Sequence, residues 1–192
     1  IQRLVTSNPS PGYVYRVAQV FANNGAGVRG DLAAVTRANL LDYEARSPAV
    51  AATATFGKLK EPLLVTTALL RATGGTSNAG RINIPNPEVS LNQAALRSPT
   101  VFNFYEPNYV LPGAVAEAGL YAPEYQILND TTAITQPNFY YGFIYTTRST
   151  TELTQQTVGL NLAPFYSLTR TPAQLAETFS LLFTGSSMPK AS

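Results

Sequence analysis

The segment 96–113 constrains the fold of this chain most strongly, because three prolines and four aromatic side chains are crowded into it. It has the sequence Leu-Arg-Ser-Pro-Thr-Val-Phe-Asn-Phe-Tyr-Glu-Pro-Asn-Tyr-Val-Leu-Pro-Gly. Proline removes a backbone donor and fixes φ, so neither a long helix nor a central strand can pass through this region. We therefore expect short turns from Val101 to Gly119, held in place by the aromatic rings.

Helix signals dominate the first third of the chain. Ser10 followed by Pro11 is typical of a helix start, and this helix is expected to end at the Asn23-Asn24-Gly25 stop. A second helix is predicted from about Gly30 to Asp42, and a third from Glu61 to Ala72. The Gly-rich segment 25–30 lacks a preceding strand, so we interpret it as a turn between helices and not as a dinucleotide-binding loop.

Further helices are expected in the second half. A short one begins at Pro123, and a longer one runs from Thr131 to Thr146, with Asp130 as its cap and Pro137 disrupting its middle. The last helix begins with a capping box, Thr171-Pro172-Ala173-Gln174, and ends at Gly185. Its predicted buried stripe consists of Leu175, Phe179 and Leu182.

Strand signals are scarce, and only 82–84 forms a weak candidate. We predict a mainly α fold, an irregular helical domain with long ordered loops rich in proline and aromatic residues, and little or no β-structure. The predicted organisation is a single domain over 1–192. It has core helices at about 11–73, a loop-rich aromatic region at about 74–146, and a polar linker with the final helix at about 147–192.

The chain contains no histidine and no cysteine. A serine triad, a His-ligated haem, zinc or copper site, a disulfide and a cysteine nucleophile are therefore impossible within this chain. We accordingly predict no catalytic residues, no metal site and no cofactor, and the composition argues against an enzyme formed by this chain alone.

Charged residues make up 12% of the chain, and the net charge is only +2. The charged share is about half of the usual value. Because the basic residues are scattered, we expect no nucleic acid partner, and no apolar run is long enough for a membrane span. A neutral surface is typical of an extracellular protein or of one buried in an assembly. The chain begins without Met in what looks like the middle of a helix, so we expect it to be a piece of a longer protein.

Four sequence blocks follow one another in a specific order. They are Asn23-Asn24-Gly25-Ala26-Gly27-Val28-Arg29-Gly30-Asp31-Leu32, Phe56-Gly57-Lys58-Leu59-Lys60-Glu61-Pro62-Leu63, Leu96-Arg97-Ser98-Pro99-Thr100-Val101-Phe102-Asn103-Phe104-Tyr105 and Pro123-Glu124-Tyr125-Gln126-Ile127. Through these four blocks the chain resembles the C-terminal part of the bacterial proteins of the domain of unknown function 1800 family. The resemblance covers nearly the whole chain. The resemblance implies a largely helical, exported protein, whether periplasmic, cell-surface or extracellular. It also implies that the N-terminal half is missing here, and it supplies no catalytic residues.

Aromatic residues are concentrated in the second half, where eleven of the twenty lie between Phe102 and Tyr145. Two interpretations stay open. The rings could form a stacking or docking surface for a glycan or a protein partner, or they could fix irregular loops onto the core. Part of the run 139–141 should be exposed, because a helix cannot bury three consecutive rings. The residues predicted to bind a partner or ligand are Phe104, Tyr105, Tyr109, Tyr121, Tyr125, Tyr140 and Tyr141.

Polar side chains near these rings allow further chemistry. The carboxylates of this region are Glu106, Glu117, Glu124 and Asp130. Paired carboxylates could cleave a glycosidic bond, and Glu124, Asn129 and Asp130 could bind calcium, although Glu124 and Asp130 also suit a first helical turn and a cap. The arginines that flank turns or prolines are expected to form structural ion pairs or to bind carbonyls. They are Arg29, Arg46 and Arg97.

These observations predict a non-catalytic structural or interaction module of an exported bacterial protein, serving as a subunit of an envelope or extracellular assembly. The expected partner is a protein: a second copy, the missing N-terminal part or another exported protein. A glycan is a further candidate. Two alternatives remain open, the C-terminal portion of a secreted, hydrolase-like enzyme whose catalytic residues lie in the missing half, and a carbohydrate-binding module.

Overall fold

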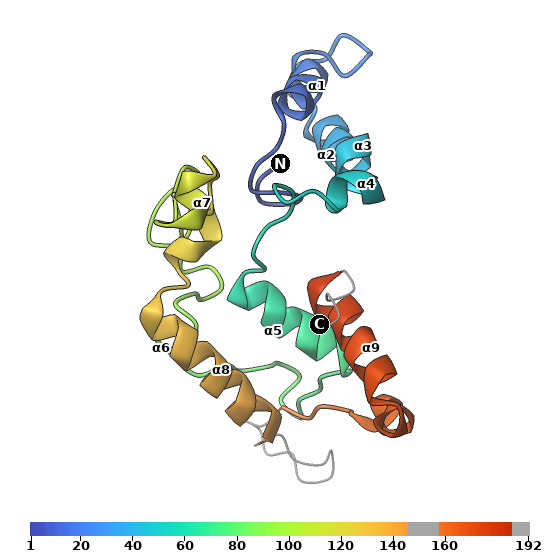
Figure 1. Cartoon of the computed structure of the whole chain (residues 1–192), viewed down its shortest axis with the longest axis vertical. Helices are drawn as coiled ribbons and strands as arrows, with labels where there is room; N and C mark the ends of the chain where they lie inside the picture. Colours follow the sequence, from blue (N-terminus) through green and yellow to red (C-terminus); the bar gives the residue numbers. More distant parts are fainter. Residues whose placement is uncertain (146–157, 186–192) are drawn as a thin grey trace. The chain divides into compact units, whose positions relative to one another are not determined.

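The structure is a computed structural model that describes residues 1–145 and 158–185 (Figure 1). Helices dominate the described residues, and β-structure among them is confined to isolated bridges such as that between Thr76 and Gly159. The predicted mainly α class is therefore confirmed. The candidate strand at 82–84 is not formed. The predicted polar tract at 146–157 lies outside the described residues.

The chain folds as two compact units, each made from two separate stretches of sequence. Unit 1 comprises 1–59 and 102–126, and unit 2 comprises 60–101 and 127–192. The elements of unit 1 are α1 (Pro11–Ala22), α2 (Leu32–Leu41), α3 (Tyr43–Arg46), α4 (Pro48–Ala51), α7 (Ala114–Glu117) and the 3-10 helix η1 (Pro123–Gln126). Those of unit 2 are α5 (Pro62–Ala72), α6 (Pro87–Ser90), α8 (Asp130–Tyr145), the 3-10 helix η3 (Ala163–Arg170) and α9 (Pro172–Thr184).

The first two helices begin where short polar side chains cap them. The Ser10 hydroxyl accepts a hydrogen bond from the Tyr13 N–H, and Pro11 occupies the first helical position, as predicted. The carboxylate of Asp31 accepts from the N–H groups of Ala33 and Ala34, so α2 starts slightly after the predicted Gly30. Three glycines between the helices, at 25, 27 and 30, have positive φ, which confirms a turn.

The core of unit 1 centres on Tyr13, whose side chain is fully buried. Its hydroxyl donates to the backbone carbonyl of Asn39 and so fixes α1 against α2. The returning segment 102–126 is attached to the first residues of the chain by polar contacts. Glu124 is buried, accepts from the Ser7 hydroxyl at 3.1 Å and pairs with the Lys58 ammonium at 3.2 Å. These contacts satisfy polar groups that water cannot reach.

Unit 2 is held by a second set of buried polar contacts around the start of α5. The Tyr140 hydroxyl of α8 donates to the carbonyl of Pro62 at 3.0 Å, and it also lies 3.1 Å from the Thr66 hydroxyl. The buried Gln93 accepts from the Leu63 N–H and donates to the Glu61 carboxylate. The irregular chain after α6 is thereby attached to the N-terminus of α5.

The structure corrects two predictions about α8. The helix continues through Pro137, although this proline cannot donate to the carbonyl of Ala133. We attribute this to tertiary contacts on either side, where Thr135 donates to the Ser90 carbonyl and Tyr140 to Pro62. The cap is Asn129, whose side-chain oxygen accepts from the Thr132 N–H, because Asp130 already lies within the helix.

The last helix also departs from its prediction in two details. The Thr171 hydroxyl donates to the side-chain oxygen of Gln174, so the expected capping box does not form. Leu182 is 40% exposed, whereas Ser180 is buried, because the face that packs on α5 is rotated relative to the predicted stripe. Gly185 has φ +73° and ends the helix as predicted.

We predict that Tyr13→Ala destabilises the protein by about 4 kcal/mol, because it opens a cavity and removes the hydrogen bond to the Asn39 carbonyl. Tyr15→Ala is the matched control. This ring lies on the same helix but is 65% exposed, so its removal should change the free energy of unfolding by less than about 0.5 kcal/mol. Urea unfolding followed by circular dichroism measures both changes, and equal costs would contradict the assignment of Tyr13 to the core.

Candidate interaction groove between α1 and α2

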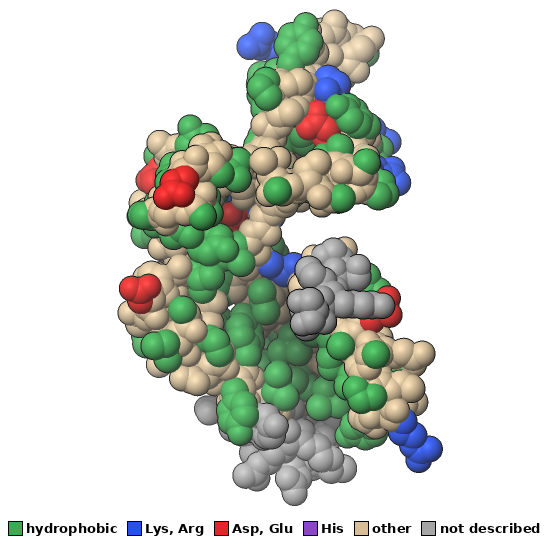
Figure 2. Space-filling view, in the orientation of Figure 1, with side chains coloured by type: hydrophobic (Ala, Val, Ile, Leu, Met, Phe, Trp, Pro, Cys, Tyr) green, Lys and Arg blue, Asp and Glu red, His purple; other side chains and the backbone are tan. Residues whose placement is uncertain are grey.

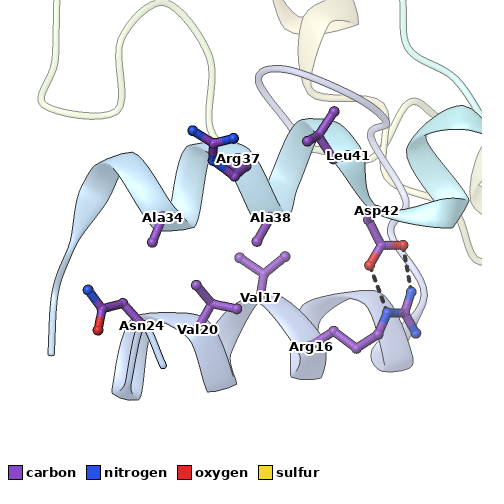
Figure 3. A pocket seen from close by; sticks show the side chains of 9 residues that line it. All are labelled: Arg16, Val17, Val20, Asn24, Ala34, Arg37, Ala38, Leu41 and Asp42. Atoms are coloured by element: carbon purple, nitrogen blue, oxygen red, sulfur yellow. Dashed lines mark hydrogen bonds and ion pairs between the residues drawn. The ribbon is translucent and has the colours of Figure 1, made fainter. Parts of the chain in front are cut away.

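A groove of about 590 Å³ lies between the antiparallel helices α1 and α2 of unit 1 (Figure 3). Small side chains face one another across it: Val17 and Val20 from α1, and Ala34 and Ala38 from α2. Because valine and alanine do not fill the space between the two backbones, an elongated hollow with an apolar floor remains. The residues that line this α1–α2 groove are Arg16, Val17, Val20, Asn24, Ala34, Arg37, Ala38, Leu41 and Asp42.

One end of the groove is closed by a network around Arg16. Its guanidinium donates to both carboxylate oxygens of Asp42, with Nε–Oδ2 at 2.7 Å and Nη2–Oδ1 at 2.8 Å. It also donates to Glu44 at 2.9 Å, and Glu44 accepts from the Ser10 hydroxyl at 2.7 Å. The paired geometry of the two bonds to Asp42 fixes the direction of the carboxylate as well as its distance. The network therefore connects the first turns of α1 to the end of α2 and to α3.

The same contacts shift the acidity of these carboxyl groups. Hydrogen bonding from Arg16 lowers the pKa of Asp42. Burial by itself raises the pKa of Glu44, but the hydrogen bonds from Arg16, Ser10 and Tyr43 outweigh burial and leave the pKa below its ordinary value. At the other end of the groove, the hydrogen bond from Asn24 lowers the pKa of Asp31. All three groups are therefore charged at neutral pH and serve structural contacts.

Around the groove, large aliphatic side chains point to solvent. The exposed fraction is 70% for Leu32, 54% for Leu41 and 46% for Leu40. In Figure 2 the part of the molecule that holds α1–α4 shows hydrophobic side chains interspersed with several basic and acidic ones. Of these three leucines only Leu41 lines the groove, because Leu32 lies nine positions earlier and therefore on the opposite side of α2. The α1–α2 groove thus has an apolar floor of valine and alanine with one exposed leucine at its edge.

The predicted aromatic residues fall into both units. Phe104, Tyr105, Tyr109, Tyr121 and Tyr125 belong to unit 1, and Tyr140 and Tyr141 to unit 2. Tyr105 is buried beneath the guanidinium of Arg3, which lies 3.9 Å from its ring centre. The ring of Tyr140 is largely turned inward, where its hydroxyl bonds Pro62. Large exposed rings in this set are those of Tyr121 and Tyr141, at 46% and 64%.

The carboxylates considered for catalysis or calcium binding are divided between the two units and have different surroundings. Glu124 is buried against Lys58 in unit 1, whereas Asp130 begins α8 in unit 2. Glu117 lies exposed on α7. The backbone N–H of Glu106 donates to the side-chain oxygen of Gln126 at 2.7 Å. Among residues 1–145 and 158–185, no group of three acidic side chains comes together in a way that could hold a metal ion.

The arginines singled out from the sequence have different surroundings. Arg97 pairs with Glu88 at 3.1 Å, as expected for a structural ion pair. Arg29 lies over the ring of Phe21, with 5.5 Å to its centre. The arginines that bind carbonyls and carboxylates most closely, Arg3 and Arg16, were not identified from the sequence. Their partners lie far along the chain, and no local pattern indicates such contacts.

Comparison with known proteins identifies the family of this chain. A family model described as "Protein of unknown function (DUF1800)" matches residues 1–191. The chain therefore belongs to the DUF1800 family, as its sequence blocks indicated. No curated protein and no solved structure matches the chain. Within the described part of the chain, no helix has the length and hydrophobicity required to cross a bilayer.

The Arg16 network predicts a specific response to acid. Because the folded pKa values of Asp42 and Glu44 are lowered, their stabilisation is complete above the ordinary carboxyl pKa of about 4 and is lost as the pH falls through the lower folded values. Arg16→Gln should remove this contribution. The difference in unfolding free energy between wild type and variant should therefore be largest above about pH 5 and shrink toward about pH 2.

Arg46→Gln is the control, since this arginine is exposed in the last turn of α3. Its unfolding free energy should follow that of the wild type at every pH. Parallel curves for wild type and Arg16→Gln down to about pH 2 would show that the network does not shift these carboxyl groups.

Proposed function

We propose that this chain is a non-catalytic interaction module of an exported bacterial protein, and that it acts as a subunit of an envelope or extracellular assembly. The observation that carries the proposal is the α1–α2 groove with its apolar floor. A groove between two helices, with the exposed Leu41 at its edge, offers a contact surface for a helix of another protein. It offers little to a small polar substrate, because its floor consists of valine and alanine.

The engaged carboxylates support the same proposal. Glu44, Glu61 and Glu124 are buried, and each is hydrogen-bonded to a side chain of its own unit. The hydrogen bonds of these carboxylates hold helices and loops together. A general acid or base would have to face a cleft and approach a substrate directly. The functional surface of this chain is therefore better explained by shape and hydrophobicity than by reactive groups.

The proposal can be tested by photo-crosslinking in the bacterium that produces the protein. A photoreactive phenylalanine analogue at Leu41, which lines the groove and is 54% exposed, should give a discrete adduct with another polypeptide. The same analogue at Thr36, an exposed position elsewhere on α2, should give no such adduct. Absence of an adduct at Leu41, or equal adducts at both positions, would argue against a role for this face in assembly.

A further inference from the structure

We propose that the α1–α2 groove of one copy binds the exposed face of α8 from a second copy, with Asp130 of α8 placed against Arg37 of the groove. This inference rests on the proposed function and specifies its partner. The contact joins different surfaces of the two copies. It can therefore form once per pair and repeat into a ring or a filament, or form twice in a two-fold dimer in which each groove binds α8 of the other copy.

The exposed face of α8 has the pattern of a docking helix. Ile134 is 67% exposed, Tyr141 64% and Ile144 37%, and Pro137 between them is also exposed. The spacing of three or four residues places all of them on one side of the helix. The opposite side packs inside unit 2, where Thr135 bonds Ser90 and Tyr140 bonds Pro62. Within the described part of the chain, Ile134, Pro137 and Ile144 therefore form an apolar stripe that is exposed along several turns of α8.

The dimensions of the stripe and the groove agree. Ile134, Pro137 and Tyr141 span seven residue steps, which corresponds to about 10 Å along a helix axis. The groove runs beside α2, a helix of ten residues and thus about 15 Å long. Its lining positions on α2, Ala34, Ala38 and Leu41, follow the same spacing of three or four residues. A helix can therefore lie along the groove with anchors on successive turns.

Charged side chains determine which way round α8 lies in the groove. Three charged side chains line the groove, and two of them, Arg16 and Asp42, are paired with one another. Arg37 is exposed and has no hydrogen bond or ion pair with the described residues, so it gives the groove a positive charge. Asp130 is exposed one turn before Ile134, on the same side of α8 as the apolar stripe. It is the only charged residue of that helix.

Other occupants fit the groove less well. A glycan is bound by aromatic rings, and no aromatic residue lines the groove. A nucleic acid requires several cations along its phosphates, whereas Arg37 is the one cation of the lining not paired with a carboxylate of the lining. A basic helix would be repelled by Arg37. A single helix in a groove buries less area than a standard interface, so we expect a weak contact whose occupancy rises with protein concentration.

A charge exchange tests the proposal on the whole chain. Sedimentation equilibrium should show that the wild type associates with increasing concentration. Arg37→Asp and Asp130→Arg should each weaken the association about tenfold, because each places like charges opposite one another. The double variant, with both changes, should recover most of the wild-type association. The controls Arg46→Asp and Glu117→Arg reverse exposed charges elsewhere on the chain, and they should leave the association unchanged. Circular dichroism of every variant shows whether the fold is kept.

Each outcome decides the question. Restoration in the double variant supports the pairing of Arg37 with Asp130. The proposal is overturned if the wild type stays monomeric, or if the double variant associates no more strongly than the single variants. A monomeric wild type would leave the proposed function standing if the Leu41 photo-crosslink identifies a different protein, so the two proposals fail separately.

Discussion

The bidentate bond between Arg16 and Asp42 determines the geometry on which the candidate site depends. Together with Glu44 and Ser10, it connects the start of α1 to the end of α2 and to α3. Tyr13 adds a buried bond to the Asn39 carbonyl one turn away. With the two helices fixed at this end, small residues at Val17, Val20, Ala34 and Ala38 leave a hollow that the chain does not fill itself. The groove thus exists because polar contacts hold the two helices at one end, while the small side chains along their length leave the space between them unfilled.

Polar contacts between segments distant in sequence also explain how loops of this length stay ordered. Both units contain buried polar groups that join segments distant in sequence, such as Glu124 with Lys58 and Gln93 with Glu61. An irregular backbone cannot satisfy its own N–H and carbonyl groups, so side chains must provide partners. Arg3, for example, donates to the carbonyls of Phe102 and Tyr105. Charges are few in this chain, and several of them are used inside the fold.

Local signals predicted the helices well. Ser10-Pro11, Glu61-Pro62 and Gly185 act on their nearest neighbours, and the observed ends of α1, α5 and α9 follow them. Tertiary contacts decided the rest: α8 runs through Pro137 because neighbouring residues are bonded to other segments. The groove could not be predicted from the sequence, since periodicity describes the apolar side of a helix but not whether another element covers it. Leu41, for example, has the character of a core residue, yet its side chain is 54% exposed.

If this chain works in contact with another polypeptide, native mass spectrometry of the protein isolated from its source should detect the complex. The native mass is then expected to exceed the denatured mass of its own polypeptide by one or more whole protein chains. A native mass equal to that of the single denatured polypeptide, under conditions that preserve known weak complexes, would show that the protein works without such a partner.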